Sequence, residues 1–267
     1  MMNAQQSYSD IIIPVIRNVR KMLLPHYGNT NFQNKQSDKK FELVTELDVN
    51  VERFLKTAFE KLYPDIAFVG EEGSGNRERA RFWLVDPIDG TTPFIRGIPF
   101  CTTMVALIEN GQVIFSAIYD FVNNIMYHAE KEKGAFANGA PIHVSSRTLR
   151  GAYLTWETHL DKAQNLSWFL RLREEAVLWH LGASGFEYTL IASGKLEGKI
   201  CVDPHGKDYD FAAGTFLVSE AGGTVANIGK KTYDYRNGNF IASNSLVFKA
   251  LTSGQNAIFP AEKLITV

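Results

Sequence analysis

The stretch that decides the fold of this chain is WLVDPIDGTTPF, which spans residues 83–94. The apolar run Phe82–Val85 predicts a buried strand, and two carboxylates, Asp86 and Asp89, follow it three residues apart. Pro87 lies between them, fixes its own φ angle and biases the preceding residue toward an extended conformation. We therefore expect a sharp turn that directs both carboxylates into one small volume.

The residues after this acidic pair predict an anion pocket. Residues 90–93 (GTTP) are typical of a helix start, because threonine caps a helix and proline is tolerated in its first turn. Unpaired N–H groups and the helix dipole attract anions at such a position. We also expect the Ile88 carbonyl to face the carboxylates. A cation cluster beside an anion pocket indicates phosphoryl transfer.

A second acidic pair lies upstream, in FVGEEG at residues 68–73. It also ends a short apolar segment, and its glycines let the backbone pack closely. Either pair could instead be an ordinary solvated turn, since Asp, Pro and Gly are common turn residues. Two strand ends that carry acids favour a metal site. Glu71, Asp86, Asp89 and one backbone carbonyl would suit two Mg²⁺ ions, which prefer oxygen ligands.

Other catalytic patterns are not found in the sequence. The six histidines show no metal-type spacing with one another or with cysteine. Cys101 and Cys201 have no local partner pattern, and a G-x-S-x-G nucleophile motif is absent. Two metal ions can neutralise a phosphate monoester and activate water near neutral pH, so this hydrolysis needs no histidine base.

Composition agrees with an enzyme that has one large core. The chain has 267 residues, and its net charge of −1 gives no general attraction to nucleic acid or anionic membranes. Two cysteines argue against a disulfide framework, so we expect a reducing cytoplasm. Arg17, Arg20 and Lys21 interrupt the apolar stretch Ile11–Leu24, which predicts an amphipathic helix rather than a signal peptide or a membrane span.

Periodicity and turn signals predict the order of helices and strands. In the first half we expect a helix over 8–24, a polar loop over 29–40, a helix over 48–62 and an antiparallel sheet over 101–144. In the second half we expect strands alternating with helices. The strands should cover 152–155, 176–179 and 199–202, and the helices 163–173, 183–193 and 210–221.

Four motifs resemble, in content and in order along the chain, those of the inositol monophosphatase family. The members of this family are Mg²⁺-dependent, Li⁺-sensitive phosphatases. They are LVTELD at 43–48, GEE at 70–72, DPIDGTT at 86–92, and YDFAAG at 209–214 continuing to EAGG at 220–223. Bacterial members of the family include extragenic-suppressor (SuhB-type) proteins, histidinol phosphatases and bisphosphate nucleotidases, and the resemblance favours the SuhB type. The resemblance implies an α/β fold, a layered α/β/α/β/α sandwich of the type shared with fructose-bisphosphatase, and a homodimer. Residues 1–145 would carry the main metal motifs, and residues 146–267 would complete one compact unit.

The resemblance also implies which residues hold the metal ions. The ligands of one ion would be Glu71, Asp86 and the Ile88 carbonyl. Those of a second would be Asp86, Asp89 and Asp210, and a third, weaker ion would lie near Glu71. Asp210 opens the last predicted helix, where an aspartate is otherwise simply a cap. It can reach the other ligands only if the two halves of the chain fold onto each other.

Catalytic and phosphate-binding roles follow from the same resemblance. Thr91 and Asp48 would orient the water that attacks phosphorus, with Glu71 and its ion beside them. The phosphate would lie against the Gly90 and Thr91 amides. Hydrolysis would thus proceed by metal-activated water.

The alcohol part of the substrate is less closely defined. Family members that hydrolyse inositol phosphates carry an acid seven positions before the last metal aspartate, and here that position is Asp203. Asp203 and Asp210 would then bind the substrate, which favours inositol 1-phosphate. Tyr209 and Pro93 stand where tryptophan and asparagine are common in the family. Histidinol phosphate and bisphosphate nucleotides therefore stay open as alternatives.

A binding role is the alternative from another functional class. SuhB-type proteins are associated with transcription complexes, so this chain could act mainly by binding transcription machinery. The sequence has no basic stripe interleaved with aromatic residues, and Arg77, Arg79 and Arg81 form only a short charged stretch. Composition therefore favours the enzyme.

Overall fold

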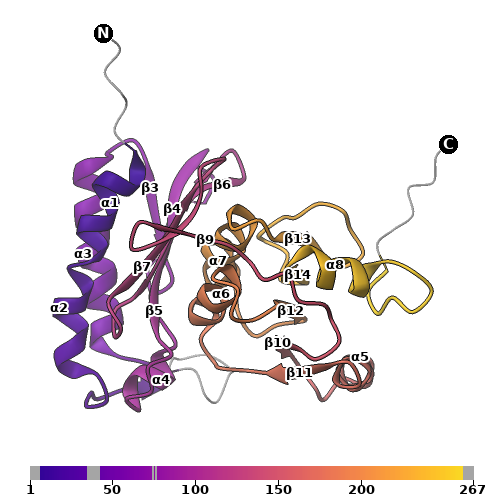
Figure 1. Cartoon of the computed structure of the whole chain (residues 1–267). Helices are drawn as coiled ribbons and strands as arrows, with labels where there is room; N and C mark the ends of the chain where they lie inside the picture. The colour runs from indigo at the N-terminus through magenta and orange to yellow at the C-terminus, as the bar shows by residue number, and fades with distance from the viewer. Residues whose placement is uncertain (1–6, 35–42, 74, 76, 261–267) are drawn as a thin grey trace, which may run out of the picture.

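The computed structural model describes residues 7–34, 43–73, 75 and 77–260, which form alternating layers of helices and sheets (Figure 1). Helices α1 (Tyr8–Ile16), α2 (Val19–Leu23) and α3 (Glu46–Leu62) cover one face of the first sheet. Helices α6 (Ser184–Ala192) and α7 (Asp208–Glu220) lie between the two sheets. Helices α5 (Ala163–Arg173) and α8 (Ser245–Thr252) cover the outer face of the second sheet. The predicted layered sandwich is confirmed.

The first sheet has seven strands. Their order is β3 (Ala67–Gly70), β4 (Arg81–Asp89), β5 (Thr102–Glu109), β6 (Gln112–Asp120), β7 (Ile125–Glu130), β8 (Gly134–Ala137) and β9 (Ala140–Ile142). β3 and β4 run parallel, and the other neighbours run antiparallel, which confirms the sheet predicted over 101–144. Two of its turns, Asn110-Gly111 and Asn138-Gly139, have positive φ at both residues, as tight hairpins require.

The second sheet has five strands, and the chain adds strands first on one side of β10 and then on the other. Their order is β11 (Ala176–Trp179), β10 (Ala152–Thr158), β12 (Gly198–Val202), β14 (Phe240–Ser243) and β13 (Thr224–Asn227). β10 runs parallel to both of its neighbours. The chain passes from β10 through α5 to β11 on one side, then through α6 to β12 on the other. The strand order therefore reverses at β10.

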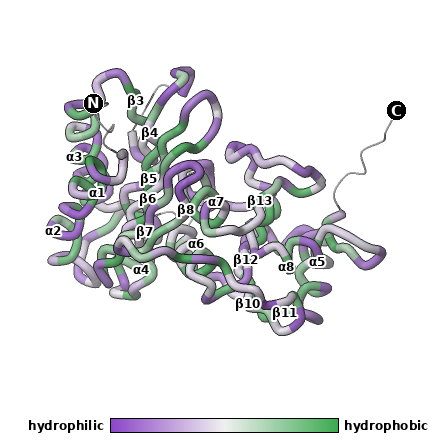
Figure 2. Tube along the Cα trace, turned by 45° about the horizontal axis from the view of Figure 1, so that its top comes forward, coloured by the Kyte–Doolittle hydropathy of each residue, from purple (hydrophilic) through white to green (hydrophobic). Residues whose placement is uncertain are grey.

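Hydrophobic residues concentrate in the strands and on the inner faces of the helices, and the turns are hydrophilic (Figure 2). The largest core joins strands of both sheets to α6 and α7. The predicted boundary between 145 and 146 falls between the last strand of the first sheet and the first strand of the second. As a division into domains it stays a prediction.

The predicted single helix over 8–24 is wrong, because the structure divides it at Arg17 and Asn18. The Asn18 N–H bonds to the Val15 carbonyl, and the Asn18 side chain donates to the Pro14 carbonyl at 2.9 Å, which takes the acceptor that the helix would use. Among the described residues, no helix has both the length and the apolar character needed to cross a lipid bilayer.

Several other boundaries differ from the prediction. Helix α3 begins at Glu46 rather than Asp48, because Thr45 caps it. In the predicted loop over 29–40, residues 29–32 form neither helix nor strand, and residues 33–34 form a short strand, β1 (Gln33–Asn34), with β2 (Leu43–Val44). Residues 35–40 lie outside the described residues. The second-half helices agree within two residues, and the first strand there continues to Thr158. β13, β14 and α8 were not predicted.

A substitution between α6 and α7 should test how tightly the middle layer packs. A methyl group at position 214 would lie 1.8 Å from Cδ2 of the buried Tyr188 ring. We expect Gly214→Ala to lower the free energy of unfolding by about 1–3 kcal/mol in urea, because overpacking outweighs the helix propensity gained. Ser219→Ala, on the exposed side of the same helix, should change it by less than about 0.5 kcal/mol. Equal effects of the two changes would contradict this packing.

Candidate metal centre

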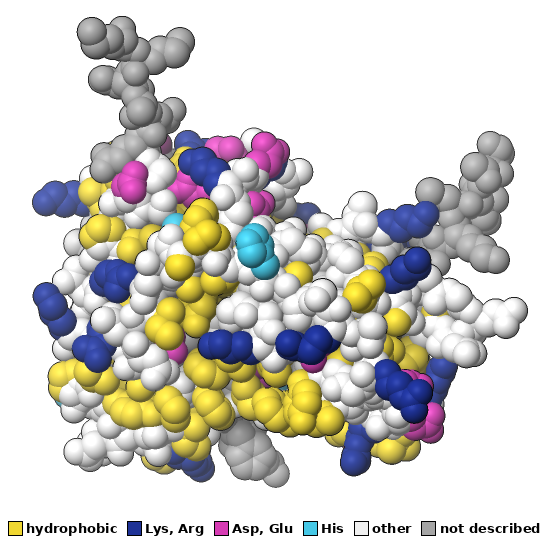
Figure 3. Space-filling view, in the orientation of Figure 1, with side chains coloured by type: hydrophobic (Ala, Val, Ile, Leu, Met, Phe, Trp, Pro, Cys, Tyr) yellow, Lys and Arg dark blue, Asp and Glu magenta, His cyan; other side chains and the backbone are white. Residues whose placement is uncertain are grey.

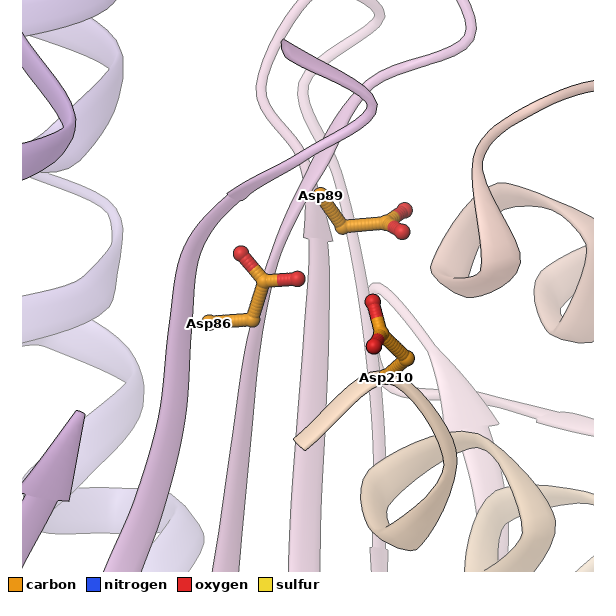
Figure 4. Close-up of side chains that lie close together, drawn as sticks. All are labelled: Asp86, Asp89 and Asp210. Atoms are coloured by element: carbon orange, nitrogen blue, oxygen red, sulfur yellow. The ribbon is translucent and has the colours of Figure 1, made fainter. Parts of the chain in front are cut away.

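Three carboxylates from distant parts of the sequence meet where β4 ends and α7 begins. Asp86 and Asp89 belong to β4, and Asp210 lies in the first turn of α7. One oxygen atom of each lies within 4.8 Å of the others. Figure 4 shows the three side chains pointing toward one another. The two halves of the chain thus fold onto each other at this point.

A bulge in β4 explains why two acids three positions apart share one site. Asp86 pairs with Met104 of β5, and the pairing resumes at Asp89 opposite Thr102. Three steps on β4 therefore face two on β5, and Pro87, which has no N–H to donate, lies within the irregularity. In a regular strand, residues three apart point to opposite faces. The predicted sharp turn is instead this bulge within a longer strand.

The segment after β4 forms the predicted helix start. Gly90 has a φ of 81° and precedes the one-turn helix α4 (Thr91–Ile95). A Cβ atom at position 90 would lie 2.4 Å from the Phe100 carbonyl oxygen, so the site requires glycine. The Ile88 carbonyl accepts a hydrogen bond from Thr91 Oγ1 at 3.0 Å. Its role as a metal ligand stays a prediction.

Asp89 is fixed by hydrogen bonds from three directions. Its Oδ1 accepts from the Ser184 N–H at 2.9 Å. Its Oδ2 accepts from the Gly185 N–H at 2.9 Å and from Thr102 Oγ1 at 3.0 Å. The first turn of α6 and the start of β5 therefore hold this carboxylate in one orientation.

Asp210 is the third residue of α7, not its first. Its Oδ2 accepts a hydrogen bond from the Lys207 N–H at 2.6 Å. A Cβ atom at position 206 would lie 3.1 Å from the same Oδ2. The loop before α7 therefore packs closely on this carboxylate and satisfies one of its oxygens, as a helix cap does.

The three aspartates lie in an environment that opposes their charge. Burial, followed by repulsion from Glu71, Asp89 and Asp210, raises the pKa of Asp86 well above its usual range. Burial also raises the pKa of Asp89 to about 7, although the hydrogen bonds from Thr102 and Gly185 lower it. The pKa of Asp210 is raised by burial and by Glu71. A group of carboxylates that repel one another is stabilised by a cation.

The donor atoms fit a hard divalent cation. All the acidic groups offer oxygen, which Mg²⁺ prefers over nitrogen or sulfur. Asp86 is 1% exposed, and its Oδ1 makes no hydrogen bond among the described residues. A buried carboxylate oxygen without a donor has a place for a metal ion.

Glu71 lies beside this cluster, in the loop after β3. It is the strongest source of repulsion on Asp86 and also hydrogen bonds to it. Glu52 of α3 supports this loop, because its Oε2 accepts from the Glu72 N–H at 2.7 Å. A Cβ atom at Gly70 would lie 2.1 Å from the Glu52 carboxyl carbon. Glu52 was not among the predicted site residues, although it lies one helical turn after Asp48.

Asp48 and Thr91 meet as the resemblance implied. Thr91 Oγ1 lies 3.3 Å from Asp48 Oδ1. The other oxygen of Asp48 accepts from the Thr45 N–H at 2.8 Å and from Thr45 Oγ1 at 2.6 Å. Asp48 is therefore both part of the helix cap and a neighbour of Thr91. Its catalytic role stays a prediction.

Asp203 is not brought to the three aspartates. Its side chain is 42% exposed and forms an ion pair with Lys162. Its backbone has a φ of 50° and donates to Asn239 Oδ1 at 2.5 Å. These contacts hold Asp203 at the protein surface, where Lys162 neutralises it.

A buried ionic network near Asp89 was missed by the sequence analysis. Lys199 is 1% exposed and contacts both Glu187 of α6 and, at 3.1 Å, Glu157 of β10. Lys199 Nζ also lies 3.3 Å from Ser184 Oγ, next to the amide that binds Asp89. The signal was available: Glu157 and Lys199 are charged residues within short apolar strands.

Comparison with known proteins agrees with these motifs. The model of the inositol monophosphatase family matches residues 4–259. The chain belongs to the inositol monophosphatase family. It is therefore a phosphatase of this family, as the resemblance of the four motifs implied.

Alignments with individual relatives cover most of the chain. It is 29% identical over 252 residues to the fructose-1,6-bisphosphatase/inositol-1-monophosphatase of Thermotoga maritima, with 93% of this chain and 96% of that protein covered. It is 32% identical over 222 residues to Nus factor SuhB of Pseudomonas aeruginosa, with 79% and 81% covered. The Thermotoga maritima IMPase structure matches with a TM-score of 0.81 and 29% identity, over 90% of this chain and 93% of that one.

The pKa of Asp89 predicts how the metal-free protein responds to pH. In the folded state it is about 7, against an ordinary value of 3.8, so between these values the folded state binds a proton that the unfolded chain does not. Stability without metal should therefore fall as pH rises through this range. We expect Tm in EDTA to be lower at about pH 8 than at about pH 5, and Mg²⁺ to raise Tm more at the higher pH.

Asp89→Asn provides the control for this measurement. It removes the titrating carboxyl, so the fall of Tm with pH should be weaker and the gain from Mg²⁺ smaller. A wild-type Tm that responds to neither pH nor Mg²⁺ would rule out an acidic metal centre here.

Proposed function

We propose that this protein hydrolyses a small phosphate monoester with the help of Mg²⁺. The observation that carries this proposal is the group of three mutually repelling aspartates, Asp86, Asp89 and Asp210, beside the Gly90–Thr91 backbone. Glu71 and the Ile88 carbonyl would complete the ligands of two or three ions. When bound, the ions supply positive charge that neutralises phosphate and acidifies water in the site.

The protein's own groups would orient the reactants. The hydroxyl of Thr91, held between Asp48 and the Ile88 carbonyl, would position the attacking water. The Gly90 and Thr91 amides would bind phosphate oxygens. The water oxygen bonds to phosphorus, the ester P–O bond breaks, and the alcohol leaves with a proton. Phosphate and the alcohol are the products.

Inositol 1-phosphate is the first substrate to test, because relatives of this chain carry the name inositol-1-monophosphatase. The Asp203 carboxylate is paired with Lys162, so a polyol that binds Asp203 must share or replace this partner. A panel with histidinol phosphate, fructose 1,6-bisphosphate and adenosine 3′,5′-bisphosphate separates the alternatives. If Asp203 does contact a polyol, Asp203→Ala should selectively reduce the rate with inositol 1-phosphate.

A role in transcription is the second candidate, and it rests on the relative named Nus factor SuhB. The test is affinity capture of transcription components with and without Mg²⁺, alongside the phosphatase assay. Capture that persists in a variant without phosphatase activity would establish a separate binding role.

We propose that the protein forms a homodimer in a reducing cytoplasm. The resemblance to the family supports the dimer, as do exposed apolar side chains that include Ile98, Tyr153 and Val177. Figure 3 shows hydrophobic side chains gathered along the lower part of the face in view. Cys101 and Cys201 are both free and buried, which agrees with a reducing compartment. Solution scattering that gives a monomer mass at micromolar concentration would refute the dimer alone.

Removal of one metal-centre carboxylate should abolish turnover. We expect Asp89→Asn to lower kcat at least about 100-fold, since even the outer-shell partners of a metal contribute about 10–100-fold. Asp208→Asn changes an acid two positions from Asp210 that pairs with Arg77 instead, and it should retain near-wild-type kcat. Both are measured by phosphate release with and without EDTA. Turnover that resists the chelator would overturn the proposed function.

The Thr91 hydroxyl should matter for chemistry rather than for binding. Thr91→Ala removes the group that contacts Asp48 and should lower kcat by about 100-fold with little change in KM. Thr91→Ser keeps the hydroxyl and should recover most of the rate. Steady-state kinetics of the two variants decide the matter, and equal rates would exclude a role for the hydroxyl.

A further inference from the structure

A cavity of ≈ 320 Å³ lies at the edge of the second sheet. Its walls come from the ends of β10 and β11, from α5, and from the segments after β11 and β12. The side chains that define its chemistry are Trp156, Glu157, Phe169, Trp179, His180 and His205. The metal centre uses none of these residues.

The position of this cavity is one that the topology of the sheet favours for a ligand. The parallel strands β11, β10 and β12 end at the same edge, and the strand order reverses at β10. The helices after β10 and β11 lie on opposite faces of the sheet, because α5 packs in the outer core and α6 in the middle one (Figure 1). Such a switch point leaves a crevice at the carboxyl ends of the strands, where α/β sheets bind ligands.

The cavity adjoins the metal centre through one residue, Gly206. The Gly206 N–H donates to Glu157 Oε1 at 2.9 Å, and Glu157 is part of the cavity wall. On its other side, a Cβ atom at this position would lie 3.1 Å from Asp210 Oδ2. The cavity and the metal centre are therefore neighbours that share Gly206 as a common wall.

Aromatic side chains form much of the cavity wall. The ring centroids of Trp156 and Phe169 lie 6.0 Å apart, and Trp156 is 4% exposed. Trp179 is 42% exposed, and its ring packs edge-on with that of Tyr153 at a centroid distance of 5.0 Å. The one carboxylate in the wall is already engaged, because Glu157 accepts from Gly206 and contacts Lys199 at 3.1 Å. Trp156 Nε1 and Thr158 Oγ1, which also belong to the wall, are buried and make no hydrogen bond among the described residues, so each can bind one polar atom of a ligand. A heteroaromatic ring suits both features, because it stacks on aromatic side chains and carries a polar atom at its edge.

We propose that this cavity binds the alcohol part of the substrate and that this alcohol carries an aromatic or heteroaromatic ring. The inference rests on the proposed phosphatase function and names the class of its leaving alcohol. Phe169 and Trp179 contact the substrate ring, and Trp156 Nε1, Thr158 Oγ1 and His180 offer polar groups to an atom at its edge. The reaction is the hydrolysis described above, with phosphate and the ring-bearing alcohol as products.

The test compares esters whose alcohols are equally poor leaving groups. Benzyl, 2-phenylethyl, 3-phenylpropyl and 2-(imidazol-4-yl)ethyl phosphates are assayed with Mg²⁺ against butyl phosphate and inositol 1-phosphate. We expect kcat/KM of the best ring ester to exceed that of butyl phosphate by at least about tenfold. Trp179→Ala should remove this preference through KM, and Trp179→Phe should restore much of it. Leu170→Ala, which is exposed beside Phe169 but outside the cavity wall, should not change it.

A binding measurement separates the two proposals. 3-Phenyl-1-propanol, an alcohol product that needs no metal, is titrated calorimetrically into the wild type and Trp179→Ala, and we expect it to bind only the former. If the alcohol binds in this way but no ester is hydrolysed, the phosphatase proposal fails and the ring site stands. If esters are hydrolysed without preference for a ring, or if the preference survives Trp179→Ala, the ring site is wrong and the phosphatase proposal stands.

Discussion

Repulsion among Asp86, Asp89 and Asp210 is the constraint on which the rest of the site depends. Their carboxylates share one small volume, and burial raises the pKa of each. Backbone N–H groups and a threonine hydroxyl donate hydrogen bonds to Asp89 and Asp210 and so partly stabilise their charge. Among the described residues, no lysine or arginine forms an ion pair with any of the three aspartates. The nearest buried cation, Lys199, is already paired with Glu157 and Glu187. Protonation relieves this repulsion at low pH, and above the raised pKa values a bound cation would supply the missing positive charge, because leaving several buried carboxylates unpaired is strongly unfavourable.

The layered fold provides the rigidity that such a site needs. Two carboxylates come from a strand in the first sheet, and the third comes from a helix packed between the sheets. The contact between Gly214 and the Tyr188 ring locks that helix against its neighbour α6, whose first turn also binds Asp89. Distortion of the middle layer would thus move the third carboxylate and the hydrogen-bond donors of the second together. Packing far from the metal centre therefore contributes directly to its geometry.

Local patterns in the sequence predicted the acidic pairs, the glycine-started helix and the antiparallel hairpins, because each depends on residues close in the chain. The bulge at Pro87 was mistaken for a turn. Proline either ends a strand or bends it, and the pairing with β5 decides between these outcomes. No local pattern in the sequence reports that pairing. Asp203 was selected through the family resemblance, and its ion pair with Lys162, 41 positions away before α5, is a contact that no local pattern reports. The charged residues Glu157 and Lys199 within apolar strands indicate buried ions, but their pairing depends on the contact between β10 and β12, which no local pattern reports. Helix α8 was also missed, although Asn244 is a local cap that the sequence shows.

The metal centre and the cavity beside it are built from different parts of the fold. In the proposed function, charge neutralisation and phosphate binding would belong to β4, α4 and the start of α7, where position is fixed by a bulge, a glycine and buried carboxylates. The cavity proposed for the alcohol lies at the strand ends of the second sheet and is lined by side chains such as Trp179 that are partly exposed. Substitution of an exposed aromatic side chain removes little core packing, whereas substitution of a buried acid changes the charge that the whole site must balance. Under this proposal, substitutions in the second sheet would change specificity while the phosphate chemistry of the first sheet is kept.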